Sequence, residues 1–284
     1  MAQNNKIVSI KESLVAVLEY LENHAKKPFD DSFNKDFMQI GKSGLYLHKQ
    51  DFVILTGQNS SGKTSLALSI LRKLAVESNR AIAFISCCEL DAISITLRLL
   101  SQKAEVSLSK LHIGLLKKDD VEKIKLAAEN LFETPIFLNE FSDSAVTYKD
   151  LEAEIENMVK KYNVETVFID SLDCIKEISN QNERKMLFKK LKALAGKLNI
   201  AIVLISSLEI FEKTSIFGLK KIVRNDDVDM LLVLNREFNR DENVKVQPCN
   251  LSVEKDDVFG VRDIALSFTL NGARFDFEEE SYEK

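Results

Sequence analysis

The feature that most constrains the fold is the segment Gly57 to Thr64, which matches G-x-x-x-x-G-K-[ST] at every fixed position. Residues 51–56 before it form an apolar run with strand character, and residues 65–74 after it have helix character. A glycine-rich loop between a strand and a helix is a P-loop, whose backbone N–H groups turn inward onto phosphate oxygens. The positive N-terminal end of the helix would also face the phosphates. The sequence therefore predicts a nucleotide-binding site.

Two P-loop side chains have distinct expected roles. We expect Lys63 to reach the β and γ phosphates and to take part in catalysis, and the Thr64 hydroxyl to bind Mg²⁺. ATP and Mg²⁺ are therefore the predicted cofactors. The predicted nucleotide-binding residues are Gly57, Gln58, Asn59, Ser60, Ser61, Gly62, Lys63, Thr64 and Ser65.

Two acidic residues stand at the ends of apolar runs, where an ATPase needs carboxylates. Asp170 ends the run 167–170, and we interpret it as the group that completes the metal shell, although an ordinary strand can also end in an aspartate. Glu89 follows residues 83–88, the strand expected after the P-loop helix. A glutamate there could align or deprotonate the attacking water, or it could be only a charge at the start of the next helix.

The chain after residue 44 alternates apolar, β-rich runs with helical stretches. Such alternation predicts an α/β fold of βαβ units, with a mostly parallel sheet that helices cover on both faces. Ligands of such folds bind at the carboxyl ends of the strands. Residues 250–254 and 264–268 are interpreted as two more strands, an antiparallel C-terminal extension. The predicted parallel strands are residues 52–55, 81–86, 135–138, 164–170, 200–206 and 230–234.

The N-terminal part is predicted to be a separate helical arm. Ile10, Leu14, Val17, Leu18 and Leu21 recur at the spacing of an amphipathic helix over residues 10–24. Pro28 then breaks the helical pattern. We therefore expect an arm over residues 1–31 and an ATPase domain over residues 32–284, with the arm packed on its own domain or on a neighbouring copy.

The charge and the apolar runs of the sequence exclude two classes: proteins that bind nucleic acid through a general basic surface, and membrane or secreted proteins. A net charge of −5 gives no general basic field, so any contact with nucleic acid must be local. The sequence has no run near the roughly 18 apolar residues of a membrane span, and its start does not resemble a signal peptide. We therefore expect a soluble, cytoplasmic protein with no membrane partner.

The order of these motifs resembles the C-terminal ATPase domain of DnaB-type replicative DNA helicases, which belong to the RecA-like class. Residues 89–92, with Arg98 and Leu99, are similar to the family's S-L-E-M-S-A segment. Residues 169–172 are similar to its I-D-Y-L, and residues 191–195 to its L-K-A-L-A. The similarity covers residues 32–275, and residues 10–24 resemble the linker helix of full-length relatives. It implies a RecA-like fold, ATP hydrolysis by a hexameric ring, single-stranded DNA as a partner and a role in DNA replication. Glu89 would be the catalytic base.

The sequence also departs from the family pattern at places with electrostatic consequences. Relatives carry K-x-R-N-G-P-T-G near the end, where lysine and arginine reach the neighbouring subunit's γ-phosphate. Lys255 is retained here, but Asp257 stands at the arginine position, where it would repel the developing phosphate charge. Ser207 replaces the glutamine of S-Q-L. Lys220, Lys221 and Arg224 fall where the DNA-contacting loop is expected, although charges on a surface loop are often only solvated.

Three functional hypotheses follow. The first is an ATP-hydrolysing, DnaB-like helicase that acts in replication or on single-stranded DNA. The second is a degenerate or truncated nucleotide-binding paralogue that partners or regulates a full-length helicase, with little turnover of its own. The third, a RadA-like or KaiC-like ATPase, shares the core but has no motif in its favour. Asp257 and Ser207 favour the second. The first is favoured by the intact residues Lys63, Thr64, Glu89 and Asp170.

Overall fold

The computed structural model of the chain describes residues 37–40, 44–87, 90–141, 146–176, 180–207, 227–236 and 245–278. The chain divides into two compact units, Met1–Met38 and Gln39–Lys284. The predicted arm helix, residues 10–24, lies outside the described residues, so the domain boundary after residue 31 stays a prediction. Strand β1 (Phe37–Gln39) spans the boundary between the units, and all other described elements belong to the second unit.

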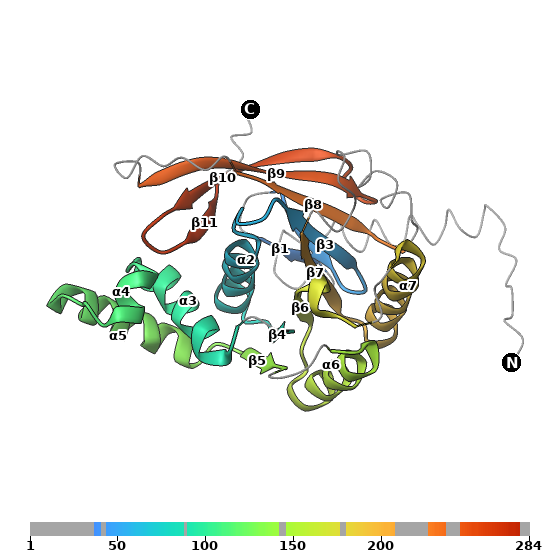
Figure 1. Ribbon diagram of the computed structural model, residues 1–284, viewed down its shortest axis with the longest axis horizontal. Coiled ribbons are helices and arrows are strands. Elements are labelled where there is room, and N and C mark those ends of the chain that lie inside the picture. The colour runs from blue at the N-terminus through green and yellow to red at the C-terminus, as the bar shows by residue number, and fades with distance from the viewer. Residues whose placement is uncertain are drawn as a thin grey trace, which may run out of the picture. The chain divides into compact units, whose positions relative to one another are not determined.

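A single large sheet forms the centre of the second unit (Figure 1). In the described part of the chain it has nine strands, in the order β11-β10-β9-β8-β3-β7-β6-β4-β5. The six strands from β8 to β5 are parallel, and β9, β10 and β11 extend the sheet antiparallel at one side. The parallel strands are β3 (Phe52–Gly57), β4 (Ile82–Ser86), β5 (Ile136–Glu140), β6 (Thr166–Asp170), β7 (Ala201–Ser207) and β8 (Met230–Asn235). The remaining strands of the unit are β2 (Tyr46–His48), β9 (Val246–Asp256), β10 (Arg262–Thr269) and β11 (Arg274–Phe277).

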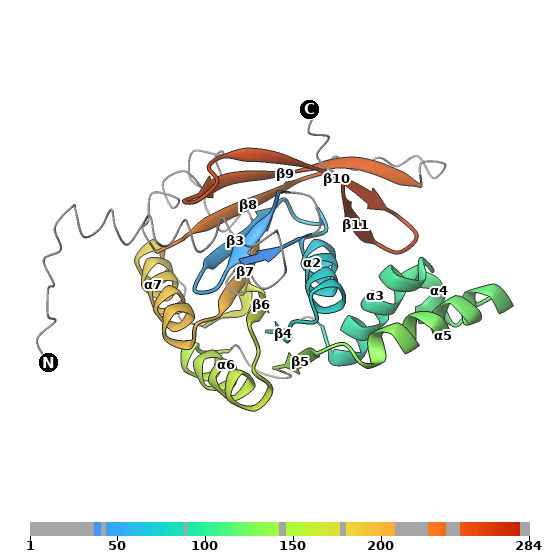
Figure 2. The same ribbon diagram turned by 180° about the vertical axis from the view of Figure 1, so that it is seen from behind.

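Helices cover both faces of the parallel strands, as Figures 1 and 2 show from opposite sides. Helix α2 packs on one face against β3, β4, β6 and β7, and α3 packs beside it. Helices α6 and α7 cover the other face, where their apolar side chains join the main core. Each described helix is too short or too polar to cross a membrane. The helices are α2 (Lys63–Glu77), α3 (Ala92–Ala104), α4 (Leu108–Ile113), α5 (Lys118–Phe132), α6 (Tyr148–Tyr162) and α7 (Gln181–Leu198), with a 3₁₀ turn at Leu172–Cys174.

The predicted fold class is confirmed, and the physical reason is the burial of the parallel strands. Every residue of β3, β4 and β7 is buried, so these strands are apolar runs up to their carboxyl ends and do not alternate. Each predicted parallel strand overlaps a strand of the structure, and the predicted C-terminal pair corresponds to β9 and β10. Strand β11 was not predicted. It contains only four residues, too few for a period to be read.

The register of the strands brings the sequence motifs to one edge of the sheet. Gly57 at the end of β3 lies beside Ser207 at the end of β7. Asp170 at the end of β6 lies beside Ile205 of β7 and Ser86 of β4. Because the carboxyl ends of parallel strands share an edge, segments more than 100 residues apart in sequence meet there.

Candidate nucleotide-binding site

Glycine is required at two positions of the loop between β3 and α2. A Cβ added to Gly57 would lie 2.8 Å from the Leu234 carbonyl oxygen and 2.9 Å from Ser61 Oγ, so no side chain fits. Gly62, which precedes α2, has φ +102°, a conformation that L residues rarely adopt. The loop therefore passes close to β8 and then turns directly into the first turn of α2.

The Lys63 ammonium lies over the loop that precedes it. Its Nζ donates hydrogen bonds to the carbonyl oxygens of Gly57, at 3.2 Å, and Gln58, at 3.0 Å. These acceptors are neutral, whereas a phosphate oxygen offers a charge-assisted bond of about twice the strength. The arrangement therefore holds a cation at the position where the β and γ phosphates are expected.

Thr64 and Asp170, the two predicted metal ligands, are in direct contact. The Thr64 hydroxyl donates a hydrogen bond of 2.7 Å to Asp170 Oδ2. Hydroxyl, carboxylate and phosphate oxygens are the donors that Mg²⁺ prefers, so this pair fits the metal that accompanies ATP. Burial, with Asp170 nearby, raises the pKa of the neighbouring Cys87 to about 12. The thiol of Cys87 therefore stays protonated and is not a thiolate ligand at neutral pH.

A cavity of about 960 Å³ opens in front of this pair. It is large enough for a nucleotide, since ligand pockets typically measure about 300–1,000 Å³. Asp170 and Ser207 line it as well. The predicted nucleotide-binding residues that line it are Asn59, Ser60, Gly62, Lys63, Thr64 and Ser65.

Two arginines that the sequence did not identify as site residues also line this cavity. Arg98 belongs to α3, and Arg184 belongs to the first turn of α7. Arg98 belongs, with Leu99, to one of the motifs that resemble the helicase family, which is a weak sequence signal. Arg184 has no such signal, because only the packing of α7 on the sheet brings it to the cavity. Both guanidinium groups add positive charge to a cavity that is suited to phosphate.

A second cavity of about 800 Å³ adjoins the loop on the side of β8 and β9, and Gln58 and Ser61 contribute to its wall. Arg236, just after β8, also lines it. The Arg236 Nη2 donates a hydrogen bond of 3.2 Å to the carbonyl oxygen of Ser60, and the guanidinium lies over the Phe268 ring at 4.1 Å. The loop thus lies between two cavities, one lined by the predicted phosphate- and metal-binding residues and one lined by Arg236.

The two residues predicted to act in trans lie far from their own P-loop. Asp256 pairs with Met230 at the start of β8, whereas Gly57 pairs with Leu234 near its end. The Lys255 ammonium donates to the Val228 carbonyl oxygen and lies 3.5 Å from Asp257 Oδ2. The Asp257 side chain is 61% exposed. Contact with a nucleotide at this place would therefore need a second copy of the chain.

Arg262, the other cation of this hairpin, is held within its own chain. Its Nη1 donates to Asp256 Oδ2 at 2.8 Å and to the Gly260 carbonyl oxygen at 2.9 Å. Its Nη2 donates to the Gly44 carbonyl oxygen at 2.9 Å. These bonds fix the turn between β9 and β10. The remaining predicted site residues, Glu89, Lys220, Lys221 and Arg224, lie outside the described residues.

A P-loop between β3 and α2, at the carboxyl edge of a mostly parallel sheet and in contact with an aspartate two strands away, defines a RecA-like P-loop NTPase. Residues 34–277 match the family model described as DnaB-like helicase C terminal domain, and the chain belongs to this family.

Individual relatives agree with this assignment. The probable plasmid replicative DNA helicase of Chlamydia trachomatis is 30% identical over 219 residues, which cover 74% of this chain and 48% of the relative. The replicative DNA helicase DnaB of Rickettsia prowazekii is 28% identical over 216 residues, 71% of this chain and 43% of the relative. The chain thus spans about half the length of the curated relatives it matches.

Two solved structures share the fold. One is an isolated ATPase domain that superposes with a TM-score of 0.70 at 16% identity, and the match covers 95% of this chain and 99% of that one. A DnaB-like replicative helicase, whose structure was described with its interactions with primase, gives a TM-score of 0.70 at 17% identity. That match covers 96% of this chain and 68% of the other.

Proposed function

We propose that the chain binds ATP·Mg²⁺ at the P-loop and hydrolyses it as a helicase-type ATPase of DNA replication. The observation that carries the proposal is the hydrogen bond of 2.7 Å between Thr64 and Asp170, beside Lys63 and the large cavity. It joins the two residues that would supply oxygen ligands to the metal, at the edge of the sheet where the loop N–H groups would bind phosphate.

Each residue of the site has a separate part in the proposed reaction. The backbone N–H groups of the loop hold the phosphates at the start of α2, and Lys63 balances the charge of the β and γ groups. Thr64 and Asp170 would hold Mg²⁺, which neutralises phosphate charge when it is bound. Arg98 and Arg184 also line the cavity and add positive charge to it. Glu89 would accept the proton of the attacking water.

We also propose that the active form is a ring of copies that acts on single-stranded DNA in the cytoplasm. The family membership and the names of the relatives, which are replicative DNA helicases, support this part of the proposal. The net charge of −5 means that DNA must be held by a local group of cations. Lys220, Lys221 and Arg224 are the proposed group.

One observation favours a second candidate function, a nucleotide-binding partner or regulator of a full-length helicase with slow turnover. Asp257 is exposed at the position where relatives carry an arginine, and the Lys255 ammonium is already bound by its own chain. A neighbouring nucleotide would therefore face a carboxylate. An arginine finger is worth about 10³–10⁵ in rate, so its loss alone would leave a slow ATPase.

Glu89→Gln is expected to keep ATP binding and to lower hydrolysis by about 10²–10⁴-fold, because the amide can hold water but cannot take its proton. The matched control is Asp91→Asn, two residues away. Asp91 caps α3 by accepting a hydrogen bond of 2.7 Å from the Ser94 N–H, and asparagine caps helices equally well. Single-turnover hydrolysis and ATP affinity should be measured for both variants. Equal rates for Glu89→Gln and the parent would make Glu89 a helix-start charge, and a parent without turnover would favour the second function.

A further inference from the structure

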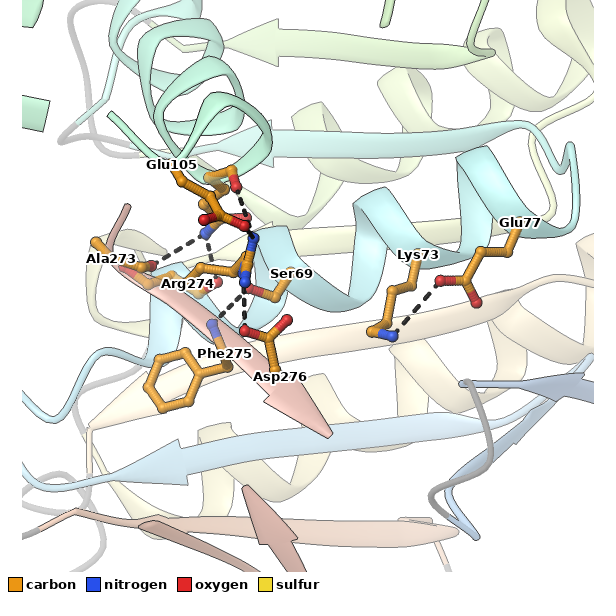
Figure 3. A network of polar contacts seen from close by, with 10 residues as sticks. Ser69, Lys73, Glu77, Glu105, Ala273, Arg274, Phe275 and Asp276 are labelled. Atoms are coloured by element: carbon orange, nitrogen blue, oxygen red, sulfur yellow. Dashed lines mark hydrogen bonds and ion pairs between the residues drawn. The ribbon is translucent and has the colours of Figure 1, made fainter. Parts of the chain in front are cut away.

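The last strand of the sheet is anchored to the helix that follows the P-loop, as Figure 3 shows. The Phe275 N–H of β11 donates a hydrogen bond of 3.1 Å to Ser69 Oγ of α2. Gln102 of α3 joins α2 to the residue just before β11, since its Nε2 donates to the carbonyl oxygens of Ser65, at 2.9 Å, and Ala273, at 3.2 Å. Arg274 pairs with Glu105 at 2.6 Å. Strand β11 therefore has a fixed position on α2.

The anchoring places an aromatic ring against the P-loop itself. The Phe275 side chain is fully buried, and a Cβ added to Gly62 would lie 3.1 Å from both Cε2 and Cζ of its ring. Gly62 is the residue with φ +102° that connects the loop to α2. The ring therefore fills the space beside the backbone that turns toward the phosphates.

A second contact joins the same aromatic group to the loop two residues earlier. The Phe275 and Phe268 rings are 4.7 Å apart, and Arg236 lies over the Phe268 ring at 4.1 Å. Arg236 in turn donates a hydrogen bond of 3.2 Å to the Ser60 carbonyl oxygen. The loop is thus contacted at Ser60 by Arg236 and at Gly62 by Phe275. Arg236 packs on Phe268, so both contacts involve the Phe268 and Phe275 ring pair of the antiparallel extension.

We infer that Phe275, with Phe268, is a positioning residue for nucleotide binding. The ring pair fixes the P-loop between Ser60 and Gly62 in the geometry that the phosphates require, before the nucleotide arrives. Preorganisation of this kind raises affinity because less ordering remains to be done on binding. The inference rests on the proposed binding of ATP at this loop, and it gives the antiparallel extension a role in that binding.

A buried phenylalanine also contributes to the core, so the test must separate loop positioning from stability. Phe52 provides the matched control, because it is as fully buried as Phe275 and lies at the other end of β3, five residues before the loop begins. Phe275→Leu and Phe52→Leu remove the same ring from buried sites. Both variants should be compared under conditions where denaturant titration shows them to be folded. If Phe275→Leu does not fold, Phe275→Met, which is flexible and fills irregular gaps, takes its place.

Two readouts decide the inference: ATP affinity, and hydrogen exchange of the loop amides 58–64 without nucleotide. We expect Phe275→Leu to weaken ATP binding about 10-fold, because the loop must then be ordered when the nucleotide binds, and to speed loop exchange. Phe52→Leu should change neither. The inference would be overturned if the two variants had equal effects on both readouts. It would also be overturned if Phe275→Leu left the hydrogen exchange of the loop amides unchanged. A parent that does not bind ATP would refute the proposed function instead, and the exchange readout would then still decide whether Phe275 orders the loop.

Discussion

Lys63→Ala is expected to lower ATP turnover by at least about 10²–10³-fold, the usual effect of removing one preorganised donor from an active site. The Lys63 ammonium already lies over the loop, where it donates to the carbonyl oxygens of Gly57 and Gln58. Its removal takes a mobile positive charge away from the β and γ phosphates, so ATP binding should weaken as well. Titration with ATP and steady-state turnover measure the two effects.

Lys73→Ala is the matched control for this variant. Lys73 belongs to the same helix and pairs with Glu77 at 3.5 Å, an i,i+4 contact. Such pairs contribute only about 0.3–0.5 kcal/mol to stability, so the variant should fold and bind ATP like the parent. A folded Lys63→Ala protein with the ATP affinity of Lys73→Ala would remove the P-loop assignment.

Asp257→Arg is expected to raise ATP hydrolysis, by as much as about 10³-fold if the new guanidinium acts as a full arginine finger. Asp257 is exposed on the hairpin between β9 and β10, at the edge of the sheet away from its own P-loop. An arginine there would replace repulsion of a neighbour's γ-phosphate with a charge-assisted contact. Because the contact acts in trans, the gain should appear only at protein concentrations where copies associate.

Asp263→Arg makes the same change of charge on the adjacent strand β10, where the side chain is exposed. It should leave turnover unchanged at every concentration, which separates a finger from a general effect of charge. Turnover and solution mass should be followed together over a dilution series. No gain in Asp257→Arg despite demonstrated association would show that Asp257 does not face the neighbouring nucleotide.

The sequence was sufficient to predict the parts of the fold and site that depend on local pattern. The loop from Gly57 to Thr64 is a contiguous motif, and the parallel strands are apolar runs because both of their faces are buried. The meeting of Thr64 with Asp170, 106 residues later, followed from a general rule, since the carboxyl ends of parallel strands share one edge.

The parts that could not be predicted depend on how distant side chains pack. Arg184 reaches the cavity because α7 lies across the sheet, and nothing in the spacing of its neighbours indicates this. Gly62 and Phe275 are brought together by strand β11, which has only four residues. Arg236, which follows β8, donates a hydrogen bond to the Ser60 carbonyl oxygen. A motif specifies the residues that touch the ligand, whereas these supporting contacts exist only after the whole sheet has formed.

The most direct test of the account is ATP turnover of the parent chain with and without single-stranded DNA and with and without Mg²⁺, measured alongside solution mass. The account predicts Mg²⁺-dependent hydrolysis that single-stranded DNA accelerates, in a species several times the 32.2 kDa of one chain. ATP binding with no turnover under any of these conditions would contradict the proposed enzyme and favour the regulatory partner. A folded chain that binds no ATP in the presence of Mg²⁺ would contradict the central claim itself.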